Sequence, residues 1–270
     1  MNHATAPRTT RSPGWIVGGR RPAAPAVRLF CLPYAAGGAS IYAPWRSSFA
    51  DDIELCPVEL PGRQTRRRDS AFTCVDSLVD ALASGLAGEF DVPYALFGHS
   101  MGSLVAFELA RALRRRGVGE PSVLFVSGGR APQLPREHPV VHDQPDAVVI
   151  AKLRSLGALP KDICDEPELV ELLMPTIRAD LTVCETYEYR PEPPLTCPIV
   201  AFAGADDPEV PPARMDPWRE QTSGGFLKQV LPGDHFFLHS SRSALLDAVH
   251  AALAGALRQG PAARTRLSVG

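Results

Sequence analysis

Residues 92–102, VPYALFGHSMG, decide the fold of this chain. The apolar run 92–97 leads into a sharp turn with Ser100 at its apex and a glycine two residues away on either side, and a helical pattern follows over 102–116. A turn tight enough to expose a serine oxygen crowds the neighbouring backbone, and glycine removes the side chains that would clash there. Strand, turn and helix in this order are typical of a nucleophile elbow. We therefore predict that Ser100 is a nucleophile, with an ordinary glycine-flanked turn as the alternative.

Strand-like and helical patterns alternate on both sides of this stretch. Continuous apolar runs are typical of strands that are covered on both faces, and apolar residues at helical spacing indicate helices that pack on a sheet. The predicted strands cover 27–32, 53–60, 92–97, 122–127, 198–203 and 226–231, and the predicted helices cover 75–90, 102–116 and 242–257. This alternation predicts an α/β fold with a mostly parallel central sheet and helices on both faces.

The alternation stops between residues 130 and 189. This stretch contains many prolines and two helical patterns, 146–156 and 167–187, each with an apolar stripe. An apolar stripe has to be covered, so an inserted helical lid over the catalytic opening explains the segment better than a linker does. The predicted organisation is a disordered leader at 1–25, a domain at 26–257 with a lid at about 130–189, and a flexible tail at 258–270.

Composition excludes several classes of protein. A net charge of −2 over 270 residues gives no electrostatic reason to expect a nucleic acid partner. No apolar run approaches the roughly 20 residues that a membrane span requires. The six cysteines are scattered without a C-x-x-C pair, so neither a zinc site nor a disulfide scaffold is indicated. This favours a reducing compartment, with an extracellular disulfide pair as the weaker alternative. We therefore expect a cytoplasmic protein with no metal, no nucleic acid and no membrane partner.

Two candidate partners for Ser100 follow later predicted strands. Asp207 comes after the strand at 198–203, and His235 comes after the last one. The carboxyl ends of parallel strands meet at one edge of a sheet, so the three side chains are expected to lie together. There His235 would take the proton of the serine hydroxyl, and Asp207 would orient the imidazole and stabilise its cation. The neighbouring Asp206 is the alternative acid.

The glycine-rich loop 33–40, PYAAGGAS, follows the first predicted strand. It lacks the G-x-G-x-x-G and Gly-Lys-Ser/Thr patterns of phosphate-binding loops. A loop at this place can instead donate a backbone N–H to an oxyanion, and we expect the donors to be Ala35 and Met101. A plain flexible loop is the alternative.

Several motifs together resemble those of type II thioesterases, the stand-alone α/β-hydrolases found beside polyketide synthases and nonribosomal peptide synthetases. The motifs are LFCLPYAAGGAS at 29–40, LPGR at 60–63, FGHSMG at 97–102, RADL at 178–181, GADD at 204–207, Trp218, and GDHFFL at 233–238. One departure is Ala36, where the family often has glycine. The resemblance implies an α/β-hydrolase fold.

The resemblance also implies a reaction and a partner. Such enzymes hydrolyse acyl groups from the phosphopantetheine arm of acyl or peptidyl carrier proteins, which clears stalled or misprimed synthases. The implied path is an acyl-enzyme at Ser100, formed by a monomer with no cofactor of its own. Two alternatives stay open: an esterase or lipase that acts on free small-molecule esters with the same triad, and a catalytically silent α/β-hydrolase that only binds a ligand or partner.

A basic cluster follows the LPGR motif. Its members are Arg63, Arg66, Arg67 and Arg68. Since carrier proteins are usually acidic, these arginines are a candidate docking surface, and an ordinary solvated surface is the alternative.

Overall fold

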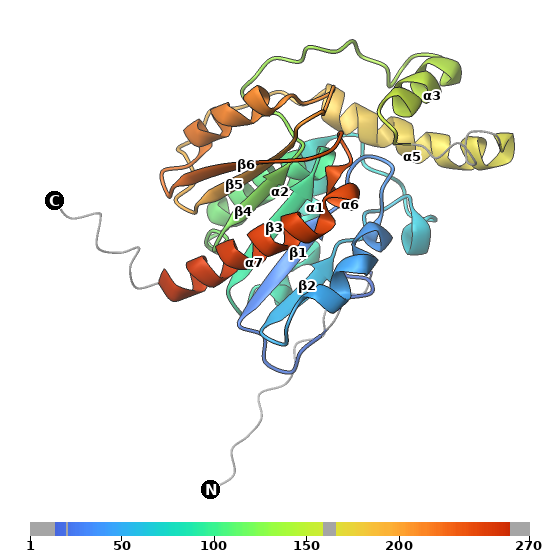
Figure 1. Ribbon diagram of the computed structural model, residues 1–270. Coiled ribbons are helices and arrows are strands. Elements are labelled where there is room, and N and C mark those ends of the chain that lie inside the picture. The colour runs from blue at the N-terminus through green and yellow to red at the C-terminus, as the bar shows by residue number, and fades with distance from the viewer. Residues whose placement is uncertain (1–13, 20, 159–165, 260–270) are drawn as a thin grey trace, which may run out of the picture.

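The computed structural model describes residues 14–19, 21–158 and 166–259 (Figure 1). Within them lies a six-stranded sheet in the order β2-β1-β3-β4-β5-β6, and every neighbouring pair is parallel. The strands are β1 Val27–Leu32, β2 Ile53–Pro57, β3 Tyr94–His99, β4 Leu124–Ser127, β5 Ile199–Gly204 and β6 Phe226–Leu231. The predicted α/β class and mostly parallel sheet are confirmed.

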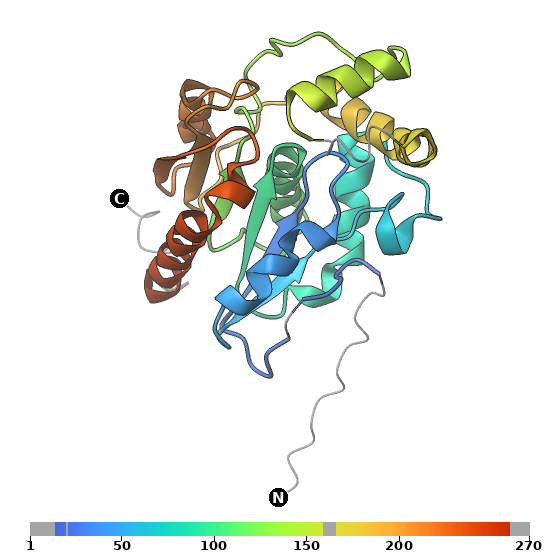
Figure 2. The same ribbon diagram turned by 45° about the vertical axis from the view of Figure 1, so that its right-hand side comes forward.

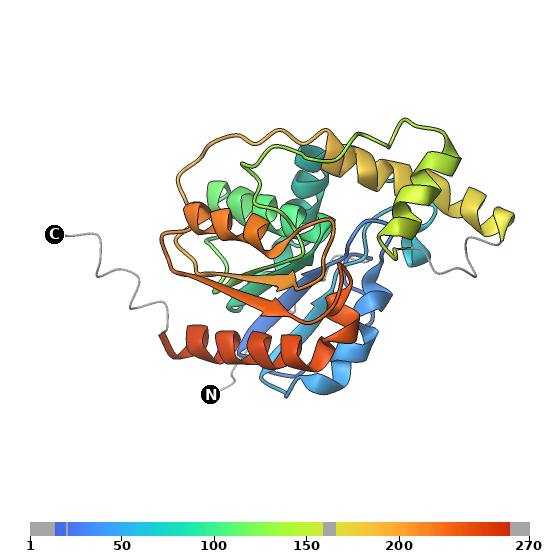
Figure 3. The same ribbon diagram turned by 45° about the horizontal axis from the view of Figure 1, so that its top comes forward.

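Helices cover both faces of the sheet, as Figure 3 shows most clearly. The helices α1 Val75–Gly85 and α2 Met101–Arg115 pack on one face, and α7 Arg242–Gln259 and the 3₁₀ helix Ala39–Ser48 pack on the other. Successive residues of β1 point to opposite faces, so Phe30 belongs to the first core and Leu29 to the second. This double burial explains why the strands read as continuous apolar runs.

The strand order places a crevice beside the turn at Ser100. The chain passes from β1 outward to β2 and then returns to β3 on the other side of β1, so the connections after β1 and β3 leave in opposite directions. Ligands of open parallel sheets bind at such a switch point, outside the carboxyl ends of the strands. Here those ends carry the loop after β1 and Ser100 after β3.

Two helices of the predicted lid lie between β4 and β5 in sequence, α3 Asp146–Ser155 and α5 Pro167–Glu185. They lie together at one end of the sheet (Figure 2) and share a small apolar cluster that includes Val149, Leu153 and Ile177. Part of the predicted lid, 159–165, lies outside the described residues. No helix in the described part of the chain has the length and apolar character to span a membrane.

The predicted leader needs correction. Residues 1–13 and 20 lie outside the described residues, but 14–19 are in contact with the domain. Ile16 makes an antiparallel bridge to Val58 next to the edge strand β2. The Trp15 indole lies where a Cβ on Gly85 would be 2.1 Å from its ring nitrogen, and the guanidinium of Arg66 stacks on its face at 4.1 Å. The prediction of disorder is therefore wrong for this stretch. Most of the predicted tail, 260–270, lies outside the described residues, and α7 extends to Gln259.

Two short helical stretches and a helix end differ from expectation. The 3₁₀ helices Ala39–Ser48 and Pro212–Gln221 were not predicted, because each contains a proline and neither carries a clear apolar stripe at the 3.6-residue period. The predicted helix at 75–90 is α-helical only to Gly85 and ends in the 3₁₀ turn Ala87–Glu89.

Candidate active site

Ser100 occupies a strained backbone position between β3 and α2. Its φ of 54° and ψ of −116° lie in a region that non-glycine residues rarely adopt. Its N–H donates to the carbonyl of Ser127 at 2.7 Å, and its carbonyl accepts from the N–H of Ser103 at 2.9 Å. These bonds hold the turn in a shape that points the hydroxyl away from the sheet.

Two glycines make this turn possible because backbone segments meet there. A Cβ on Gly98 would lie 1.9 Å from the carbonyl oxygen of Gly102. A Cβ on Gly102 would lie 2.3 Å from the carbonyl oxygen of Leu32 at the end of β1. Both contacts involve backbone atoms, which cannot move aside cheaply. The crowding expected from the sequence is therefore present at both positions.

A chain of hydrogen bonds joins the three predicted side chains. The Nε2 of His235 lies 3.0 Å from the Oγ of Ser100, and its Nδ1 lies 2.8 Å from Oδ2 of Asp207. With the proton on Nδ1, the imidazole donates to the carboxylate and can accept from the serine hydroxyl. His235 and Asp207 are both buried.

The structure also separates the two candidate acids. Asp207 faces the imidazole, and its Oδ1 accepts from the backbone N–H groups of Glu209 at 2.8 Å and Val210 at 3.0 Å. These bonds fix the carboxylate as the β5 loop turns away from the strand. The side chain of Asp206 is exposed, and its backbone N–H donates to Gly233 at 3.0 Å. Asp207 is therefore the acid that the fold brings to His235.

The two candidate oxyanion donors line the same cavity as Ser100. Ala35 follows β1, and Met101 is the first residue of α2, whose N-terminal dipole favours negative charge nearby. Neither N–H donates to another group in the described part of the chain. The arrangement can therefore remove a proton from a serine hydroxyl and stabilise an oxyanion beside it.

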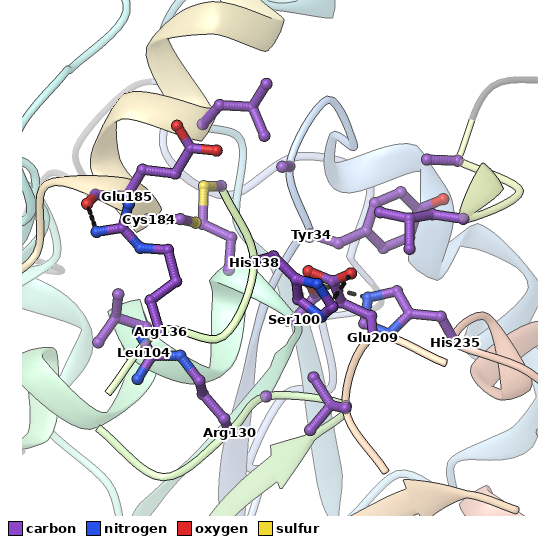
Figure 4. A pocket seen from close by; sticks show the side chains of 18 of the residues that line it. Tyr34, Ser100, Leu104, Arg130, Arg136, His138, Cys184, Glu185, Glu209 and His235 are labelled. Atoms are coloured by element: carbon purple, nitrogen blue, oxygen red, sulfur yellow. Dashed lines mark hydrogen bonds and ion pairs between the residues drawn. The ribbon is translucent and has the colours of Figure 1, made fainter. Parts of the chain in front are cut away.

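The cavity extends from Ser100 to the lid (Figure 4) and has a volume of about 190 Å³. Its apolar lining includes Leu104, Val141, Leu153, Leu156, Leu181 and Val210. Charged side chains also line it, among them Lys152 and Glu209, which form an ion pair at 2.5 Å. The mixed lining suits an apolar chain with a polar end.

His99, the residue before Ser100, lies behind the imidazole of His235. Its Nδ1 lies 2.9 Å from the Oγ of Ser127, and its ring centre lies 5.3 Å from that of His235. Burial, together with the nearby charge of His235, lowers the pKa of His99 well below its ordinary value. His99 therefore stays neutral near pH 7 and packs against the ring of His235.

The predicted docking cluster is divided between interior and surface. Arg63 is buried, and both of its terminal nitrogens bind the carboxylate of Asp180 on α5, at 2.7 and 2.8 Å. The prediction of Arg63 as a surface residue is therefore wrong. Arg66 is largely covered and pairs with Asp69, whereas Arg67 and Arg68 are exposed. Sequence reasoning missed Asp180, although it belongs to the RADL motif.

Comparison with known proteins is decisive for the family. The model of the thioesterase domain family matches residues 27–253. The chain belongs to the thioesterase family. The resemblance seen in the sequence is thus confirmed, and the thioesterase is a hydrolase of thioesters. Among the described residues of this thioesterase, no group of three or more His, Cys, Asp or Glu side chains is placed to hold a metal ion.

The thioesterase is similar to proteins of several biosynthetic pathways. It is 40% identical over 233 residues to the gramicidin S biosynthesis protein GrsT of Aneurinibacillus migulanus. The aligned region covers 86% of this chain and 91% of GrsT. The solved type II thioesterase BorB from the borrelidin biosynthetic cluster has a TM-score of 0.81 and 39% identity, covering 91% of this chain and 100% of BorB. The RedJ thioesterase of the prodiginine pathway in Streptomyces coelicolor has a TM-score of 0.81 and 38% identity, covering 93% and 96%.

Gly98→Ala should destabilise the thioesterase by about 3 kcal/mol, because the new methyl group meets the backbone carbonyl of Gly102. Urea denaturation followed by circular dichroism measures the free energy of unfolding. Gly255→Ala in α7 is the control, since nothing lies within 4 Å of a Cβ there and alanine favours a helix. Equal effects of the two changes would contradict the crowding.

His99→Gln should flatten the acid side of the stability profile. Because the pKa of His99 is lowered in the folded state, only the unfolded chain gains this proton as the pH falls below about 6.5. Folding stability is then lost with falling pH by up to about 1.4 kcal/mol per pH unit from this group. Urea denaturation between pH 5 and 7 should show a shallower slope for the variant, and parallel slopes would show that His99 does not contribute.

Proposed function

We propose that this thioesterase hydrolyses acyl thioesters from the phosphopantetheine arm of acyl or peptidyl carrier proteins, and so clears stalled or misprimed polyketide or nonribosomal peptide synthases. Its relatives include the type II thioesterase BorB and the gramicidin S protein GrsT. It would act in the cytoplasm as a monomer, without a cofactor of its own. Support comes from the family and from the site geometry.

The observation that carries the proposal is the continuous hydrogen-bonded chain from Asp207 through His235 to Ser100. It ends at a serine held in a strained turn, within a cavity that the lid covers. A catalytically silent relative would not need this alignment. These hydrogen bonds therefore favour a Ser-His-Asp triad over the binding-only alternative.

Acylation follows from the proton chemistry of these groups. His235 accepts the serine proton at Nε2 as Oγ attacks the carbonyl carbon of the thioester. The N–H groups of Ala35 and Met101 would hold the resulting oxyanion. When the tetrahedral intermediate collapses, the carbon–sulfur bond breaks, and the leaving thiolate takes the proton from His235. The acyl group is then an ester of Ser100.

Water completes the cycle by the same path. His235 takes a proton from a water molecule, whose oxygen attacks the acyl-serine carbonyl, and the same two N–H groups stabilise the second oxyanion. Collapse returns the proton from His235 to Ser100 Oγ and releases a carboxylic acid. Asp207 stabilises the imidazolium in both halves of the reaction.

The carrier would dock near the exposed arginines Arg67 and Arg68. They follow the 3₁₀ helix Gln64–Arg66, and the preceding turn is joined to the lid by a hydrogen bond of 2.6 Å from Thr176 of α5 to the carbonyl of Gly62. Basic side chains beside the lid would attract an acidic carrier.

Ser100→Ala should lower hydrolysis of an acyl-carrier thioester by about 10⁴-fold or more, because no other group replaces the nucleophile. Mass spectrometry of the carrier before and after incubation measures the loss of the acyl group. Ser77→Ala, at an exposed serine of α1, is the control and should retain full activity. Turnover by the Ser100 variant would require a different nucleophile.

Arg67→Glu combined with Arg68→Glu should raise KM for an acyl-carrier substrate about tenfold and leave KM for a small N-acetylcysteamine thioester unchanged. Steady-state kinetics on both substrates make the comparison. Arg258→Glu, near the far end of α7, is the control for a single charge reversal and is compared with Arg67→Glu and Arg68→Glu made separately. An equal effect on both substrates would refute docking at these arginines, and a preference for a matched oxygen ester over the carrier thioester would favour the esterase alternative.

A further inference from the structure

The loop that follows β1 is a turn in an unfavourable conformation. The N–H of Gly37 donates to the carbonyl of Tyr34 at 2.9 Å, which closes a four-residue turn. Its third residue, Ala36, has a φ of 65°. This is the position at which a type II turn favours glycine, and alanine is strained there. Some other interaction must therefore hold the turn in this shape.

A carboxylate from the lid faces the strained residue. The N–H of Ala36 donates to Oδ2 of Asp180 at 2.7 Å, across 144 residues of sequence. If the middle peptide of the turn flipped, the carbonyl of Ala35 would replace this N–H. A carbonyl oxygen and a carboxylate repel each other, so buried Asp180 favours the observed turn over the flipped one.

Arg63 fixes that carboxylate and the end of the turn together. It binds both oxygens of Asp180, and its Nη1 also donates to the carbonyl of Gly37 at 2.8 Å. A bidentate pair fixes direction as well as distance. Neither Asp180 nor Arg63 is among the residues that line the cavity, whereas Ala35 is.

We propose that Asp180 and Arg63 are positioning residues that anchor the turn through the Ala36 N–H and the Gly37 carbonyl, so that the neighbouring Ala35 N–H stays in place for the oxyanion and the lid helix α5 forms part of the catalytic geometry. The inference rests on the proposed function, in which Ala35 is an oxyanion donor. Because the pair does not contact the cavity, its loss acts on kcat and leaves substrate binding nearly intact.

Asp180→Ala should lower kcat by about 10-fold to 100-fold, with KM changed less than twofold, on both an acyl-carrier thioester and a small thioester. Asp180→Asn keeps an acceptor for the Ala36 N–H and should lose less. Adding Ala36→Gly to Asp180→Ala should raise kcat at least fivefold above that of Asp180→Ala alone. Glycine adopts the positive φ without strain, so the turn keeps its shape without the carboxylate. Ala36→Gly alone should have nearly wild-type kcat.

Asp146→Asn is the matched control, since it removes a lid carboxylate that pairs with Arg178 and does not contact the turn. An unchanged kcat in Asp180→Ala, or a loss that Ala36→Gly does not restore, would overturn the proposal. If Asp180→Ala does not fold, as judged by circular dichroism and Tm, the same comparison is made with Asp180→Asn. Ser100→Ala is measured in parallel: hydrolysis by that variant would reject the proposed function, whereas a Ser100-dependent reaction that is insensitive to Asp180 would reject only the positioning role.

Discussion

The close approach of three backbone segments at Ser100 is the constraint on which the rest of the structure depends. The end of β1, the end of β3 and the start of α2 meet at distances that admit only glycine at positions 98 and 102. Such contact forces the serine into a strained φ and holds its hydroxyl above the sheet. It also sets the loop after β1 beside Ser100, so one packing requirement brings together the hydroxyl of the proposed nucleophile and the N–H groups that would stabilise charge beside it.

The remaining parts of the site come from the order of the strands. β4, β5 and β6 add in sequence on the side of β3 away from β1, and the loops after β5 and β6 return Asp207 and His235 toward the elbow. The two side chains and Ser100 are already within hydrogen-bond distance of one another in this arrangement. The lid is tied to the same edge through the bond from Thr176 to Gly62 and the pair of Arg63 with Asp180, which makes it a structural neighbour of the site as well as its cover.

Much of this arrangement could be predicted from the sequence, and the exceptions have physical causes. The strand β1 was found because burial on both faces leaves a nearly unbroken apolar run, and it begins and ends where expected. The edge strand β6 also has the expected bounds, although it is only partly buried. Arg63 was assigned to the surface because a run of arginines is usually solvated, and nothing nearby in sequence indicates that a carboxylate from a distant helix neutralises it. Asp206 and Asp207 are neighbours of the same residue type, so the sequence pattern alone does not show which one faces His235. That depends on how the loop after β5 turns in space.

The contact of the N-terminal segment with β2 has a consequence for the two borders of the sheet. An uncovered border strand offers free amide and carbonyl groups to any passing chain. At the β2 border, Ile16 bridges to Val58 and Trp15 lies against Gly85. The segment therefore covers part of this edge and limits its pairing with another chain. At the opposite border, Leu227 and Val230 of β6 are exposed. The two borders thus differ in their tendency to pair with another chain. Shortening the chain to begin beyond residue 19 would uncover the β2 border, which is the better protected of the two.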